Sequence, residues 1–318
     1  MLVVVALNPA LDVTHHVHGV DWNGVNRPSA VRATPGGKGL NVARTLHALG
    51  ADVRLVGLAG GPTGATLREG LRAWGVQAEL TQIAGTTRRT FAVVDSLRDT
   101  AALFNEPGPD ITRDEYNQFR AAYVDALVDC TAVVLSGSLP SGLPPSTYAD
   151  LTMLAAEAGG VPTLLDTSGA ALLHGATARP AMVKPNLAEL AAAVGSDFRG
   201  LESGGDTATL VAAAASLRER GPGAVVISLG ADGLLAVTGE GTWLARPQPV
   251  AGNPTGAGDA TVAGLAHGVV LGRPWAERLR HAAALGAAAA AAPAAGEFCR
   301  SDYDQALAAV SVTSLEVG

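Results

Sequence analysis

The sequence predicts an α/β fold: a doubly wound, mainly parallel sheet with helices on both faces, and a small inserted β-sheet that acts as a lid. Short runs of β-branched residues and leucine recur, each followed by a turn and an alanine-rich amphipathic stretch. This alternation is typical of parallel strands joined by crossover helices. Residues 12–34 and 86–105 alternate without an alanine-rich helix, which indicates the separate small sheet.

The elements follow in chain order from these patterns. Strands of the large sheet are expected at Leu2–Leu7, Asp52–Leu58, Ala132–Leu135, Thr163–Asp166, Met182–Lys184 and Ala224–Leu229. Helices are expected at residues 38–49, 63–74, 112–128, 145–158, 186–194 and 207–219. We assign residues 1–11, 35–85 and 106–318 to the nucleotide- and substrate-binding body. Residues 12–34 and 86–105 form the predicted lid, with a hairpin turn near Arg98 and Asp99.

Composition excludes several functional classes. The chain has 318 residues, of which 48% are hydrophobic and 16% charged, so we expect a large buried core. A net charge of -7 without a long basic run argues against a nucleic-acid partner. Cys130 and Cys299 make no disulfide or metal framework. The N-terminus lacks the features of a signal peptide, and the alanine-rich run 282–295 is too short to span a membrane, so we expect a cytoplasmic protein.

The most informative motif is Asn-Pro-Thr-Gly-Ala-Gly-Asp-Ala at residues 253–260. Gly256 and Gly258 permit a close backbone approach, and the apolar stretch after Asp259 can continue as a helix. A helix N-terminus presents free N–H groups to an anion, usually phosphate. Asp259 stands where a general base would be needed. The alternative interpretation is an aspartate in the first turn that only complements the helix dipole.

A second glycine-rich motif, Gly36-Gly37-Lys38-Gly39, leads into a helical pattern that contains Asn41. Its spacing differs from a Walker A loop. Gly37 and Gly39 allow backbone contact with a ligand, and Asn41 offers an amide to hydroxyl groups. A plain turn with a solvated lysine is the alternative. Asp12, after the first strand, suits a pair of sugar hydroxyls or an Asx-turn.

Polar residues also follow four later strands. Ser138 lies in Ser136–Pro140, and Asp166 ends the 163–166 strand. Asn186 and Glu189 have capping-box spacing after Lys184, although Glu189 could instead hold a hydrated Mg²⁺ that Asp166 also faces. The Ser228–Gly233 segment fits a phosphate-facing turn. His15, His16 and His18 offer too few ligands on one strand face for a metal site, so we interpret them as part of a solvated or interface strand.

Taken together, the two glycine motifs resemble the signatures of the PfkB-type, ribokinase-like carbohydrate kinases. The match runs from residue 3 to about 290. Further motifs are similar to its hexose-phosphate branch, which includes 1-phosphofructokinase, tagatose-6-phosphate kinase and the minor 6-phosphofructokinase. These motifs are residues 8–12, 39–44, 105–109, 136–140, 166–169 and 184–186.

The resemblance implies ATP as phosphoryl donor, Mg²⁺ as cofactor, and a homodimer formed through the lid. It implies that Asp259 is the general base and that Gly256, Ala257 and Gly258 form the anion hole. It implies that the sugar phosphate is held by Asp12, Gly37, Lys38, Asn41, Arg88 and Ser138, with Arg88 on the existing phosphate. It implies that ATP is held by Lys184, Asn186, Ser228, Gly230 and Gly233, with Glu189 and Asp166 near the metal.

Two departures from the branch stand out. Thr90 occupies the position, two residues after Arg88, where an asparagine is usual, and Arg89 adds a neighbouring cation. The alanine-rich stretch 282–292 replaces a more varied helix on the adenine side. We expect an ATP-dependent kinase that converts fructose 1-phosphate to fructose 1,6-bisphosphate. Tagatose 6-phosphate or fructose 6-phosphate as acceptor, a free sugar or nucleoside as acceptor, and a non-catalytic sugar-phosphate sensor are the alternatives.

Overall fold

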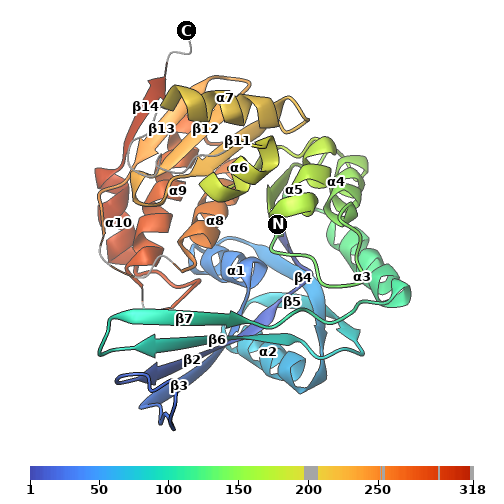
Figure 1. Ribbon diagram of the computed structural model, residues 1–318. Helices are drawn as coiled ribbons and strands as arrows, with labels where there is room; N and C mark the ends of the chain where they lie inside the picture. Colours follow the sequence, from blue (N-terminus) through green and yellow to red (C-terminus); the bar gives the residue numbers. More distant parts are fainter. Residues whose placement is uncertain (197–206, 251, 253–254, 293, 316–318) are drawn as a thin grey trace.

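A large twisted sheet forms the centre of the molecule in the computed structural model, which describes residues 1–196, 207–250, 252, 255–292 and 294–315 (Figure 1). Asn253, Pro254 and Pro293 therefore lie outside the described residues. In the described chain the sheet has ten strands in the order β14-β13-β12-β11-β10-β9-β8-β1-β4-β5. The parallel strands are β1 (Leu2–Ala6), β4 (Val53–Gly60), β5 (Gln77–Ile83), β8 (Ala132–Ser136), β9 (Thr163–Asp166), β10 (Met182–Val183) and β11 (Ala224–Ser228).

Three antiparallel strands extend one edge of this sheet: β12 (Leu234–Thr238), β13 (Thr242–Arg246) and β14 (Ser311–Leu315). The sequence analysis assigned neither this edge nor β5. The mainly parallel architecture is confirmed, and each of the six predicted strands is present, with Thr163–Asp166 exact and the ends of the others within two residues of the prediction.

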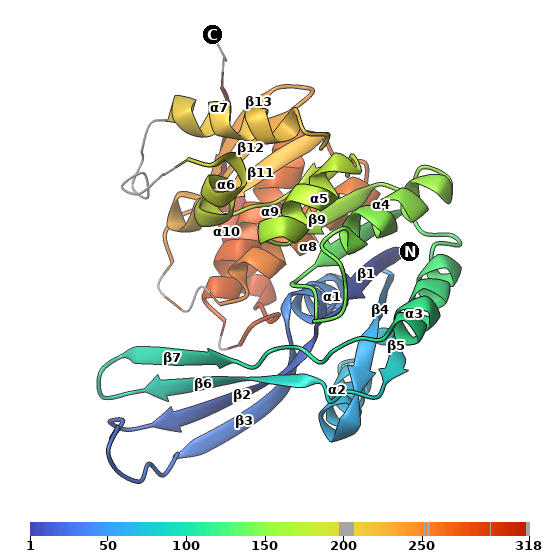
Figure 2. The same cartoon turned by 45° about the vertical axis from the view of Figure 1, so that its right-hand side comes forward.

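Helices cover both faces of the sheet, as predicted (Figure 2). Along β1, Leu2 and Val4 pack into one hydrophobic cluster, whereas Val3 and Val5 pack into the other. The first face carries α1 (Lys38–Ala48), α2 (Gly61–Ala73), α8 (Ala257–Val270), α9 (Trp275–Ala290) and α10 (Arg300–Ala309). The second carries α3 (Arg113–Ala126), α4 (Thr147–Glu157), α5 (Gly169–Thr177), α6 (Leu187–Val194) and α7 (Thr207–Arg218). Because both faces are buried at the centre of the sheet, β1, β8 and β11 are continuous apolar runs, whereas the edge strands β5 and β14 carry polar residues and are partly exposed.

A separate four-stranded sheet projects from the lower side of the body in both views (Figures 1 and 2). Its order is β3 (Ala30–Gly36), β2 (Ala10–Val17), β6 (Arg88–Asp95) and β7 (Thr100–Asn105). The two predicted segments thus pair with each other, and Asp99, with φ 52°, lies in the predicted hairpin turn. Its action as a lid stays a prediction.

Among the described residues, none of the helices is both long and apolar enough to cross a membrane. The same residues contain no group of three or more His, Cys, Asp or Glu side chains that could hold a metal ion, and the three histidines near β2 are no exception.

Candidate active site

Asp259 lies in the first turn of α8, against the first turn of α1. Gly256 precedes α8 with φ 86°, and no side chain caps the helix. A Cβ on Gly256 would lie 2.8 Å from the Ala295 Cβ, so the position requires glycine for both backbone and space. The Asn41 amide of α1 donates a hydrogen bond of 2.8 Å to Asp259 Oδ2.

The environment of Asp259 raises the pKa of its carboxyl group toward neutral pH. The side chain is only 8% exposed. Burial, together with the nearby charge of Asp166, raises the pKa of Asp259 to about 7, against the opposing effects of Asn41, Lys38 and Lys184. A carboxyl group with such a pKa can take up and release a proton at physiological pH.

Asp166 lies between two lysines at the carboxyl end of β9. Its Oδ1 lies 3.3 Å from Lys184 Nζ, and its Oδ2 lies 3.4 Å from Lys38 Nζ. The Ser136 hydroxyl donates to Oδ2 at 3.3 Å. Burial by itself would raise the pKa of Asp166, but the two lysines outweigh burial and lower it. Both oxygens are thus paired with ammonium groups in a side chain that is 1% exposed, and this pairing does not suit a direct metal ligand.

Lys184 connects this cluster to the start of α8. A Cβ on Gly258 would lie 3.7 Å from Lys184 Nζ, so the lysine reaches the turn that carries Asp259. The Lys184 side chain is buried, as expected for a charge that neutralises an anion at one fixed place. The free N–H groups of α8 and this ammonium group together form a site suited to a phosphoryl group.

Asn186 and Glu189 form the capping box of α6. Asn186 Oδ1 accepts from the Glu189 N–H at 2.8 Å, and Glu189 Oε2 accepts from the Asn186 N–H at 2.9 Å. The other oxygen, Glu189 Oε1, lies 3.8 Å from Lys38 Nζ. The structural interpretation of these residues is therefore correct, and it leaves one carboxylate oxygen for a hydrated cation.

The Ser228–Gly233 turn lies next to this cap. A parallel bridge joins Asn186 to Ser228, and the Ser228 N–H donates to the Pro185 carbonyl at 3.0 Å. Gly230 has φ 60°, and nothing lies within 4 Å of a Cβ built there, so it faces open space. Gly233, in contrast, is needed for packing, because a Cβ would lie 2.0 Å from the Ala245 carbonyl oxygen.

Asp12, one of the predicted sugar-binding residues, lies on β2 of the small sheet. Its Oδ1 accepts a hydrogen bond from the Thr90 hydroxyl, so the residue that departs from the family pattern holds this carboxylate. Gly36 makes room for the group, since a Cβ would lie 1.9 Å from Asp12 Oδ2. Burial raises the pKa of Asp12, while Thr90, Arg88 and the Gly37 N–H act in the opposite direction.

A central pocket of about 200 Å³ lies beside these groups, and Asp12, Asn41 and Asp259 are not among the residues that line it. Its lining includes Asn8, Gly37, Lys38, Arg88, Ser138, Thr167 and Glu189. The pocket therefore brings together predicted acceptor residues (Gly37, Lys38, Arg88 and Ser138) and the predicted metal residue Glu189. Lys38, predicted to hold the sugar, lines this pocket and also contacts Asp166 and Glu189. The sequence analysis missed Asn8, which donates from Nδ2 to the Ser138 hydroxyl at 3.0 Å, and Thr167, although both lie in motifs that it quoted.

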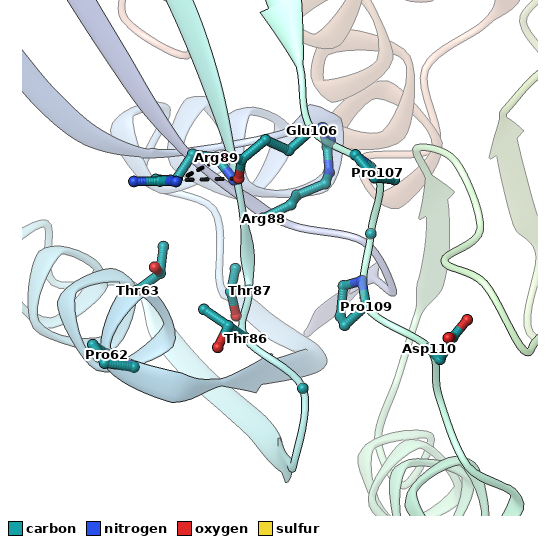
Figure 3. A pocket seen from close by; sticks show the side chains of 12 residues that line it. Pro62, Thr63, Thr86, Thr87, Arg88, Arg89, Glu106, Pro107, Pro109 and Asp110 are labelled. Carbon is teal, nitrogen blue, oxygen red and sulfur yellow. Dashed lines mark hydrogen bonds and ion pairs between the residues drawn. The ribbon is translucent and has the colours of Figure 1, made fainter.

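A second, more open cavity of about 730 Å³ lies on the far side of Arg88 (Figure 3). Arg88 borders both cavities and donates from Nε to the Asn8 carbonyl at 3.3 Å. Arg89 points away from Arg88 in Figure 3, and its guanidinium pairs with Glu106 at 2.8 Å. The extra cation is thus neutralised on the other face of the strand.

Comparisons with known proteins find similar sequences over most of the chain. Residues 4–301 match the family model described as pfkB family carbohydrate kinase. The chain is 39% identical over 286 residues to the 1-phosphofructokinase of Rhodobacter capsulatus, with 89% of this chain and 88% of that protein covered. It is 31% identical to the tagatose-6-phosphate kinase of Staphylococcus epidermidis, over 98% and 99% of the two chains.

Solved structures of phosphofructokinases have a similar fold. The tetrameric inhibited form of phosphofructokinase-2 from Escherichia coli superposes with a TM-score of 0.87 at 27% identity, covering 96% of this chain and 98% of that one. The complex of the same enzyme with fructose-6-phosphate gives a TM-score of 0.85 at 27% identity, covering 97% and 98%. The ribokinase-like fold predicted from the sequence is confirmed.

Proposed function

This chain belongs to the pfkB family of carbohydrate kinases, and we propose that it transfers the γ-phosphoryl group of ATP to fructose 1-phosphate, giving fructose 1,6-bisphosphate. The relatives named 1-phosphofructokinase and tagatose-6-phosphate kinase support a hexose phosphate as acceptor. The observation that carries the proposal is the buried Asp259, which has a pKa of about 7 and lies at an uncapped helix N-terminus within reach of Lys184.

In the proposed reaction, Asp259 accepts the proton of the attacking sugar hydroxyl. General-base assistance of this kind contributes roughly 10²–10⁴-fold to the rate. Gly256, Ala257 and Gly258 supply backbone N–H groups to the transferred phosphoryl group, and Lys184 neutralises its developing charge. Asn186, Ser228, Gly230 and Gly233 form the nucleotide side, where the bridged Asn186–Ser228 pair fixes their spacing.

The acceptor occupies the central pocket in this proposal. Gly37 and Ser138 contact the sugar from the lining of this pocket. Asp12, oriented by Thr90, and Asn41 lie outside that lining and complete the hydrogen bonds to the sugar hydroxyls. Arg88 holds the phosphate already on the sugar, because a guanidinium group matches phosphate geometry. Lys38 lies between donor and acceptor, beside Asp166 and Glu189.

Mg²⁺ fits the site through Glu189. One carboxylate oxygen remains outside the capping box and lies 3.8 Å from Lys38 Nζ, so a hydrated ion would share this oxygen with the lysine. Mg²⁺ commonly binds through one carboxylate, several waters and the substrate phosphates. The metal would neutralise charge on the ATP phosphates. Asp166 acts instead as the counter-ion of Lys38 and Lys184, which fixes their positions.

A coupled ADP-release assay across free and phosphorylated ketohexoses tests the choice of acceptor. We expect the highest kcat/KM with fructose 1-phosphate. A higher value with tagatose 6-phosphate or fructose 6-phosphate would replace the acceptor and keep the reaction. Turnover of free ribose or adenosine alone would contradict the hexose-phosphate assignment, and the absence of any turnover with retained binding would indicate the sensor.

We further propose that the small sheet forms a homodimer interface. In its register, Val31, Phe91 and Phe104 share the face opposite to Asp12 and Thr90, and Val31 and Phe104 are 58% and 50% exposed. A charge on this face, as in Phe104→Glu, is expected to convert dimer to monomer in sedimentation experiments. A wild-type protein that sediments as a monomer would contradict the proposal.

A further inference from the structure

One unpartnered polar atom belongs to a residue of the central pocket alone. In the described part of the chain, four buried side-chain nitrogen or oxygen atoms have no hydrogen-bond partner: Asn8 Oδ1, Tyr116 OH, Thr167 Oγ1 and Arg218 Nε. Asn8 and Thr167 both line this pocket, but Asn8 Oδ1 lies against Gly108 of the second cavity, since a Cβ on Gly108 would lie 2.3 Å from it. Buried polar groups are nearly always satisfied in folded proteins, so the unpaired Thr167 hydroxyl points to a ligand that completes it.

Thr167 is the sharper case. Its side chain is 2% exposed, and it directly follows Asp166 at the carboxyl end of β9, where ligands of parallel sheets bind. Ser168, the next residue, precedes α5 and makes no side-chain capping bond, so this end of the pocket also presents free backbone N–H groups. Without a ligand, an unsatisfied hydroxyl lowers the stability of the fold relative to an apolar group of the same shape.

We propose that Thr167 is a specificity-determining residue whose hydroxyl hydrogen-bonds a hydroxyl oxygen of the acceptor sugar. A threonine hydroxyl both donates and accepts, as a sugar hydroxyl does. The acceptor rather than ATP is the partner, because the proposed acceptor residues Arg88 and Ser138 line the pocket with Thr167. The nucleotide residues Ser228, Gly230 and Gly233 do not line it, although Glu189 of the metal side does. This inference rests on the proposed function.

The test compares Thr167→Val with the matched variant Thr152→Val. Thr152 is equally buried, at 3% exposure, but its hydroxyl donates to the Tyr148 carbonyl at 2.8 Å in α4. We expect Thr167→Val to keep or raise the Tm of the ligand-free protein and to raise the KM for fructose 1-phosphate about tenfold, at constant KM for ATP. Thr167→Ser is expected to restore the KM, whereas Thr152→Val lowers the Tm and leaves both KM values unchanged.

Binding of fructose 1-phosphate without ATP, measured by calorimetry, distinguishes a wrong inference about Thr167 from a wrong proposed function. If the wild-type protein binds and phosphorylates the sugar phosphate and Thr167→Val does so with the same Kd and KM, this inference is wrong and the proposed function stands. If the wild-type protein neither binds nor phosphorylates any ketohexose phosphate, the proposed function itself is wrong.

Discussion

Two pairs of helices in this molecule begin in opposite ways. At α3, Thr112 and Glu115 form a capping box, and at α6, Asn186 and Glu189 do the same. At α1 and α8, the preceding residues are Gly37 and Gly256, with φ 91° and 86°, and neither helix has a side-chain cap. Among the helices whose N-caps the structure describes, only these two follow a glycine with positive φ.

The difference separates helix starts closed by their own side chains from helix starts that follow a glycine with positive φ. A capping box satisfies the first N–H groups internally, whereas a start without one leaves them open to an anion. The two starts that follow such a glycine also touch each other, through the hydrogen bond from Asn41 to Asp259. An open helix start and a carboxylate with a raised pKa thus meet at one point.

The largest effect is expected for Asp259→Asn. The amide keeps the size and burial of the side chain but cannot accept the proton, so kcat should fall by roughly 10²–10⁴-fold. ATP binding, measured by calorimetry, should change little. Wild-type turnover in this variant would remove Asp259 from the role of base.

The pH dependence of kcat/KM should report the titration of Asp259. Because the pKa of Asp259 is raised to about 7, the carboxyl is protonated below that pH, and the base is lost as pH falls. We expect kcat/KM to decrease about tenfold per pH unit on the acid side of ~7. The residual activity of Asp259→Asn should lack this limb, and an identical limb in the variant would assign it to another group.

Arg88→Ala tests the proposed phosphate contact in the central pocket, which Gly37 and Lys38 at the start of α1 also line. Loss of a guanidinium–phosphate hydrogen bond, worth about 1.5–3 kcal/mol, should raise the KM for the sugar phosphate roughly 10–100-fold. Arg89→Ala is the matched control, because the Arg89 side chain points away from Arg88 and pairs with Glu106, so the KM of this variant should stay near the wild-type value. Equal effects of the two variants would contradict the phosphate contact.

The smallest effect on activity is expected at the capped helix α3. Thr112→Ala removes the hydroxyl that accepts from the Glu115 N–H, which should lower the free energy of unfolding by about 1 kcal/mol. Denaturant titration measures this change, while kcat and both KM values should stay constant. A fall in kcat would contradict the prediction that the capped start of α3 stabilises the fold without affecting catalysis.

Much of the fold followed from pattern. Leu2–Ala6 and Ala224–Ser228 could be recognised because buried parallel strands are continuous apolar runs. The antiparallel edge β12–β14 was missed because it does not follow the alternation of strands and helices. β12 and β13 are short strands after a glycine turn, and β14 comes from the distant C-terminal part of the chain. Of helix α9, only the alanine-rich stretch 282–292 was expected to be helical, and only through the family resemblance. Its start at Trp275 was not assigned, because the sequence carries little periodicity and packing against α8 decides its position.

The sequence by itself determined the family, the glycine motifs and the identity of Asp259 as the candidate base, because these are local signatures of turn chemistry. Only the tertiary structure decided which groups meet: Asn41 on Asp259, Thr90 on Asp12, and Asp166 between Lys38 and Lys184. These partners lie far apart along the chain, and their charges and hydrogen bonds depend on burial. Local sequence specifies a helix start, but the raised pKa of Asp259 exists only where folding removes water from it.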